Sequence, residues 1–122
     1  MIKLRQKIRS IFGRRNVGRR RRPRIDYCDL WSLDATLAYV ISCYLEEFID
    51  SVETCGSTPL DYTTRYGYDD AFGMWKKDLE RMLNAFRSYY KESDGEEISE
   101  EEKAGIQNGM ELFFKRYSDL WF

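Results

Sequence analysis

The chain has 122 residues, of which 43% are hydrophobic and 16% aromatic, which is enough for one packed domain with an appendage. No run of 18 apolar residues occurs, so the composition excludes a hydrophobic transmembrane span. The charged start predicts no secretory signal. Cys28, Cys43 and Cys55 are an odd and sparse set, which predicts reduced thiols in a cytosol-like compartment.

The net charge of −1 conceals a separation of charge along the chain. Residues 1–24 carry eleven Lys and Arg and no acid, whereas residues 25–122 carry a net charge of −12. This asymmetry predicts a basic arm at 1–24 and an acidic domain at 25–122. Because the acidic domain repels polyanions, we expect contact with a polyanion at the arm alone.

Residues 2–12 have an amphipathic pattern that predicts a short helix ending at Gly13. Its apolar face consists of Leu4, Ile8, Ile11 and Phe12. So short a helix is marginal in water, and we expect it to form against a partner, a lipid surface or the domain. Residues 14–24 are predicted to be extended, because their arginines repel one another and Pro23 disfavours helix before it.

The longest periodic segment begins after Asp29-Leu30-Trp31-Ser32 and predicts a helix over residues 33–52. Its apolar stripe comprises Leu33, Leu37, Val40, Ile41, Tyr44, Phe48 and Val52. Leu45 and Ile49 widen the stripe, so we expect this helix to contact two neighbours. We expect Trp31 to close one end of the core.

Two further helices are predicted. One begins near Asp69 and carries Phe72, Trp75, Leu79, Met82, Leu83, Phe86, Tyr89 and Tyr90 on its face. The other begins at Ser99, which forms a capping-box pattern with Glu102, and carries Ile106, Met110, Phe113, Tyr117 and Leu120. The pattern predicts an all-α fold, a three-helix bundle with a basic, partly helical N-terminal arm, and at least two of the three tryptophans in the core.

The arginines of the arm are the strongest candidate site. The predicted nucleic-acid-binding residues are Arg14, Arg15, Arg19, Arg20, Arg21, Arg22 and Arg24. Guanidinium groups at this density attract phosphate through charge and bidentate hydrogen bonds, with little discrimination between bases. The alternatives are an anionic membrane, contacted through Leu4, Ile8, Ile11 and Phe12, and a tail that docks on protein or has no ligand.

Other candidate residues indicate no reaction. Tyr62, Tyr66 and Tyr68 are weaker candidates for a protein interface. The acidic residues Glu46, Glu47, Asp50 and Glu53 lack the matching pair on the second helix that Mg²⁺-dependent all-helical pyrophosphatases have, so we predict a solvated face without metal. Histidine is absent, which removes Ser-His and Cys-His dyads. We therefore expect no catalytic residue and no cofactor, and Cys43 is expected in the core.

Several spaced residues carry a resemblance to a known group. They are Asp29-Leu30-Trp31-Ser32-Leu33-Asp34, Gly56, Pro59, Trp75, Met82, Ala85-Phe86, Gly109-Met110-Glu111-Leu112-Phe113 and Leu120-Trp121. In this pattern residues 25–122 resemble small uncharacterised helical proteins of tailed bacteriophages. The chain departs from the group in its final Phe122 and in the density of its arginine run. The resemblance implies the cytoplasm of a bacterial host, or association with the virion, and implies no activity.

These features predict a non-enzymatic, phage-type binding protein. Its helical domain is expected to contact a protein partner or a second copy, and its arm to contact nucleic acid non-specifically. One alternative is a host-directed interaction protein, such as an inhibitor of a bacterial defence, that acts through the bundle surface. Another is a peripheral membrane adaptor that acts through residues 2–12.

Overall fold

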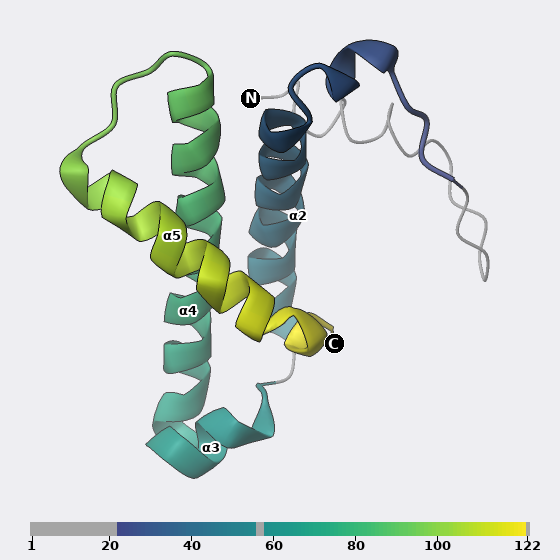
Figure 1. Ribbon diagram of the computed structural model, residues 1–122. Helices are drawn as coiled ribbons and strands as arrows, with labels where there is room; N and C mark the ends of the chain where they lie inside the picture. Colours follow the sequence, from purple (N-terminus) through teal and green to yellow (C-terminus); the bar gives the residue numbers. More distant parts are fainter. Residues whose placement is uncertain (1–21, 56–57, 122) are drawn as a thin grey trace.

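The computed structural model describes residues 22–55 and 58–121, and this part of the chain consists of helices without a strand (Figure 1). The α-helices are α2 (Leu33–Cys55), α3 (Leu60–Tyr66), α4 (Tyr68–Ser93) and α5 (Glu100–Lys115), and the 3-10 helices are η1 (Tyr27–Leu30) and η2 (Tyr117–Asp119). The all-α class is therefore confirmed for the described residues. The three long helices lie where periodicity predicts them, and the short α3 is an addition that the sequence did not predict.

Helix α4 contacts each of the other three α-helices, whereas η1 contacts α2 and η2 contacts α5. Helix α4 runs antiparallel to α2, receives α3 near its beginning, and is crossed obliquely by α5 (Figure 1). No Cα atom of α2 lies within 8 Å of one in α5. The long helices therefore form an open arrangement around α4, in which α2 and α5 do not pack directly on each other's backbone.

The core is built on one face of α4. Trp75, Leu79 and Met82, spaced four and three residues apart, are fully buried on this face. Phe86 continues the row and meets Phe113 of α5 edge-on, with ring centroids 4.9 Å apart. The face predicted for the second helix is thus confirmed at its centre.

The buried face of α2 differs from the predicted stripe. Its buried residues are Ala38, Ser42, Cys43, Leu45, Ile49 and Val52. Leu33 and Leu37, which begin the predicted stripe, are 45% and 50% exposed. Leu45, Ile49 and Val52 belong to the predicted face and are buried, whereas the burial of Ala38 and Ser42 extends the buried face beyond it. Among the described helices, α2 contacts α4 and, near its beginning, η1.

Only one of the three tryptophans is in the core, so the prediction of at least two is wrong. Trp75 is fully buried, whereas Trp31 and Trp121 are 76% and 65% exposed. Trp31 precedes α2 and Trp121 follows η2, so both lie beyond the helical segments that contact α4. The expectation that Trp31 closes the core is therefore also wrong.

The start of α5 has the capping box that the sequence predicts. The backbone N–H of Glu102 donates to the Ser99 hydroxyl at 3.1 Å, and the backbone N–H of Ser99 donates to the Glu102 carboxylate at 3.3 Å. The hydrogen bond from the Ser99 backbone lowers the pKa of Glu102. This cap fixes where α5 begins after the turn that follows α4.

Gly109 is the point at which α5 crosses α4. A Cβ atom at this position would lie 2.3 Å from the Cβ of Ala85 and 2.6 Å from the backbone oxygen of Arg81. A backbone atom cannot move aside as the end of a flexible side chain can. The crossing therefore requires glycine here and a small side chain at position 85.

We predict that Gly109→Ala destabilises the fold, by about 1–3 kcal/mol, because the added methyl group overpacks the crossing. The matched control is Gly105→Ala on the same helix, where an added Cβ meets nothing within 4 Å. That change is expected to stabilise by about 0.5–1 kcal/mol through the higher helix propensity of alanine. Urea unfolding of both variants measures the difference, and a neutral Gly109→Ala would contradict the close approach.

Candidate functional site

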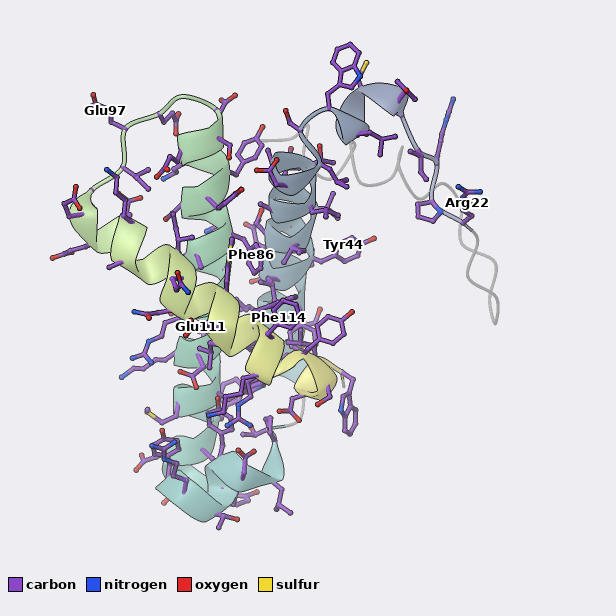
Figure 2. The ribbon with its side chains drawn as sticks, viewed as in Figure 1. Arg22, Tyr44, Phe86, Glu97, Glu111 and Phe114 are labelled. Carbon is purple, nitrogen blue, oxygen red and sulfur yellow. The ribbon has the colours of Figure 1, made fainter. Side chains whose placement is uncertain are left out.

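Arg22 and Arg24 are the two predicted nucleic-acid-binding residues in the described part of the chain. They lie in the non-helical segment before η1, and both side chains are exposed. Figure 2 places Arg22 well away from the four helices. Neither residue forms an ion pair with an acidic side chain of the described residues. At these two positions the guanidinium groups are open to an anionic ligand.

The remaining residues of the arm lie outside the described residues. They are Arg14, Arg15, Arg19, Arg20 and Arg21 of the predicted nucleic-acid site, and Leu4, Ile8, Ile11 and Phe12 of the membrane alternative. Among residues 22–55 and 58–121, no helix has both the length and the apolar character needed to cross a bilayer.

Most basic side chains of the acidic domain are already paired. Residues 25–122 contain nine Lys and Arg, and five of these form ion pairs. The pairs are Lys76–Glu53, Arg81–Asp78, Arg87–Glu46, Lys103–Glu100 and Arg116–Asp61. The positive charge of the domain is therefore neutralised locally, and its excess charge is negative.

Tyr62 is a core residue, so its predicted interface role is wrong. Its side chain is 2% exposed and its ring meets Trp75 edge-on, with centroids 5.2 Å apart. Its hydroxyl donates to Asp78, and the guanidinium carbon of Arg116 lies 4.5 Å from the ring centroid. Burial, and then the bond to Asp78, raise the pKa of Tyr62 and keep it neutral. The sequence analysis did not predict α3, the helix that carries Tyr62, and so did not predict that this tyrosine is buried.

The other two predicted interface tyrosines have different environments. Tyr66 is half-buried, with its ring centroid 5.9 Å from that of Tyr62 and the Arg65 guanidinium carbon 5.2 Å from its ring centroid. Tyr68 is 88% exposed at the beginning of α4. The three tyrosines thus do not form one surface, and only Tyr68 is fully available to a partner.

Arg116 joins the end of α5 to α3. Its side chain is only 13% exposed, and its guanidinium contacts Asp61 of α3 at 2.7 Å and Asp119 of η2 at 3.2 Å. The hydrogen bond from Arg116 lowers the pKa of Asp61. With its contact to the Tyr62 ring, this pairing is structural, and the sequence analysis did not single out the residue.

The acidic face of α2 is engaged by α4. Glu46 pairs with Arg87 at 3.2 Å, and Glu53 pairs with Lys76. No three acidic or cysteine side chains of the described residues are grouped closely enough to hold a metal ion. The acidic face of α2 therefore helps to attach α2 to α4.

Cys43, expected in the core, is buried.

A shallow groove of about 820 Å³ lies along α5 beside the second half of α4, and the sequence did not predict it. Its apolar lining includes Ile106, Met110 and Phe114, spaced four residues apart on α5. Charged residues of both helices also line it: Glu92, Lys103 and Glu111. Phe114 is 82% exposed, and Figure 2 shows it with Glu111 on α5. The groove thus combines apolar and charged side chains, with more acid than base among the charged ones.

Tyr89 lines one side of the groove and links it to α2. Its hydroxyl donates to the carboxylate of Asp34 in the first turn of α2. This hydrogen bond lowers the pKa of Asp34 and raises that of Tyr89. The hydrogen bond of Tyr89 to Asp34 therefore connects this side of the groove to the beginning of α2.

Tyr89 and Met110 pack against the core, as their stripes predict, and they also line the groove. The groove itself depends on how α5 crosses α4, for which the sequence offers no local signal.

Comparisons with protein-family models, with curated proteins and with solved structures find no match to this chain.

We predict that Asp61→Asn lowers the Tm at neutral pH, with the difference shrinking in acid. The folded-state pKa of Asp61 is lowered from its ordinary value of 3.8, so its stabilising effect is present above that value. The effect is lost as the pH falls through the lower, folded-state pKa. Thermal unfolding between pH 7 and pH 2 measures this, with the exposed Glu97→Gln as control. A Tm difference that does not depend on pH would contradict the Asp61–Arg116 bond.

Proposed function

We propose that this chain is a non-enzymatic binding protein of phage type. Its arginine-rich arm contacts nucleic acid without sequence specificity, and its acidic helical domain makes protein contacts. The observation that carries the proposal is the charge separation, with eleven basic and no acidic residues in 1–24 against a net −12 in 25–122. The likeness of residues 25–122 to phage proteins supports a place in the bacterial cytoplasm or with the virion.

The distribution of charge favours the arm over the domain as the part that contacts nucleic acid. Phosphates are bound by guanidinium groups that are exposed and not already paired, as Arg22 and Arg24 are. The domain offers the opposite situation, since five of its nine cations are held by carboxylates. A nucleic acid that approaches the domain therefore meets net repulsion, whereas the arm attracts it from a distance.

The chemistry of the arm also determines the kind of binding. Seven arginines in residues 14–24 can contact phosphates, which carry no sequence information, and this segment has few side chains of other types to read base edges. Binding energy then comes from the release of condensed counterions, so affinity is sequence-independent and falls with salt. Non-specific binding of this kind has a Kd of about 10⁻⁴–10⁻⁶ M at physiological salt.

We predict that replacing these seven arginines by glutamine abolishes binding to random-sequence DNA and RNA. For the unmodified chain, a plot of log K against log salt should have a slope of up to about −6, or about −0.9 for each of seven phosphate contacts. The matched control is Lys77→Gln with Lys115→Gln, two exposed lysines of the domain. Fluorescence anisotropy over a salt series measures both quantities.

Two results would contradict the proposal. One is equal affinity of the glutamine variant and the unmodified chain, which would move the contact to the domain. The other is a loss of binding in the lysine control as large as that in the glutamine variant.

A host-directed interaction protein is the second candidate, favoured by exposed aromatic residues ahead of α2. Tyr27 and Trp31 in and after η1 are 75% and 76% exposed. Large aromatic side chains are enriched at the centres of protein interfaces, where their burial dominates the binding energy. A host factor bound through this surface would not require the arginines.

We predict for this candidate that a stoichiometric bacterial protein stays bound to the full chain at high salt and is lost on Trp31→Ala. Leu60→Ala, which removes an 80% exposed residue of α3, is the matched control. Affinity capture from bacterial lysate measures retention. Equal retention by both variants would exclude the η1 surface.

A further inference from the structure

Two large aromatic side chains are exposed directly after the arginines of the arm. Tyr27 in η1 and Trp31, the residue that follows η1, are 75% and 76% exposed. Arg22 and Arg24, which are also exposed, precede η1 in a non-helical segment. Arg24 lies three residues before Tyr27, so their Cα atoms are at most about 11 Å apart. Guanidinium groups and exposed rings are therefore close enough for one strand of nucleic acid to contact both.

The backbone that carries the two rings is held by hydrogen bonds at both ends of η1. The Asp26 carboxylate accepts from the backbone N–H of Cys28 at 3.1 Å, which caps the beginning of η1. The Thr36 hydroxyl donates to the backbone oxygen of Asp29 at 3.0 Å and joins η1 to α2. Because their backbone is already fixed, the rings lose little conformational freedom when they bind a planar ligand.

We propose that Tyr27 and Trp31 stack on bases of a single-stranded nucleic acid whose phosphates are bound by the arginines of the arm. The inference rests on the proposed function and names its ligand as single-stranded. Every base has a π-face that an aromatic ring can cover, so stacking requires no particular sequence. Inside a duplex the faces of a base are already covered by its neighbours, and exposing them costs unstacking energy.

The spacing of the two rings also favours unpaired bases. Side chains of a 3-10 helix repeat every three residues, so Tyr27 and Trp31, four residues apart, point in different directions. Two bases that stack on these rings cannot also stack on each other as they do in a duplex. A single strand can splay its bases apart in this way.

The acidic residues of this segment do not oppose the contact. Asp26 accepts from the backbone N–H of Cys28, and Asp29 lies between the two aromatic residues in sequence. A base is uncharged at neutral pH, so a carboxylate beside the rings does not repel it as it repels a phosphate. The arm therefore supplies the long-range attraction, and the rings supply the short-range contact.

A protein partner is the other candidate for covering these rings, as in the host-directed alternative. Their place directly after the arginines favours nucleic acid, because one strand then contacts both kinds of group at once. Two linked contacts bind more tightly than either contact alone.

Three probes distinguish stacking from binding by the arm alone. They are a strand of about fifteen thymidines, an abasic strand with the same number of phosphates, and a duplex of the same length. Contact with phosphates alone favours the duplex, because its charge density is higher. Stacking reverses this preference. We therefore expect the full chain to bind the thymidine strand about fivefold or more tightly than either of the other probes.

Replacement of the rings tests their part directly. Trp31→Ala should lower the affinity for the thymidine strand about fivefold or more, with the affinities for the abasic strand and the duplex unchanged. Trp31→Phe keeps a ring and should keep most of the affinity. The matched control is Trp121→Ala, which removes a 65% exposed tryptophan after η2 and should have no effect. Fluorescence anisotropy measures all of these affinities.

The outcomes separate failure of the inference from failure of the proposed function. Equal or tighter binding of the duplex and the abasic strand, with a salt dependence that the arginine-to-glutamine variant loses, would overturn stacking and leave the proposed function in place. Binding that depends neither on salt nor on the arginines would overturn the proposed function itself. Unchanged binding of all three probes by Trp31→Ala, together with loss of a bacterial protein from lysate, would overturn stacking in favour of a protein interface.

Nuclear magnetic resonance of the full chain gives a second readout. A base stacked on Trp31 shifts the indole N–H signal of this residue upfield through its ring current. We expect this shift with the thymidine strand and not with the abasic strand, while the indole signal of Trp121 stays in place. An unmoved Trp31 signal at saturation with the thymidine strand would overturn the proposal.

Discussion

The close contact of Gly109 with Ala85 and the backbone of Arg81 determines how the domain is arranged. Because no side chain separates the helices at this point, α5 lies directly on α4 and crosses it obliquely (Figure 1). At that crossing its backbone does not reach α2. The groove lies along α5 beside the second half of α4, so its place follows from this crossing.

Charge distinguishes the N-terminal arm from the helical domain. Within the domain, carboxylates pair with the cations that attach α2 and α3 to their neighbours, as in Arg87–Glu46 and Arg116–Asp61. Pairing leaves the net charge unchanged, and the domain is acidic because residues 25–122 carry 21 acidic and nine basic side chains. Arg22 and Arg24 are exposed, and neither forms an ion pair with a carboxylate of the described residues. A basic arm on an acidic domain is suited to one class of ligand, a polyanion that the arm attracts and the domain repels.

Local patterns predicted local structure well. The capping box of Ser99 and Glu102 and the apolar row through Trp75 act within one helix, so sequence spacing alone identifies them. Which face of α2 is buried depends instead on where α4 packs, and periodicity did not single out Ala38 and Ser42 as buried residues. Tyr62 was predicted at an interface, and it lies in the core because its ring packs against Trp75 and Arg116, which belong to other helical segments. The groove likewise follows from the crossing at Gly109, which no local pattern shows.

The central claim is that phosphate is contacted by the arm and not by the helices. Nuclear magnetic resonance of the full-length chain during titration with a short random-sequence oligonucleotide tests it most directly. The claim predicts chemical-shift changes at the backbone and side-chain N–H groups of residues 14–24, with the signals of α2, α4 and α5 unchanged. Changes spread over the described helices, with the arginine signals unmoved, would contradict it.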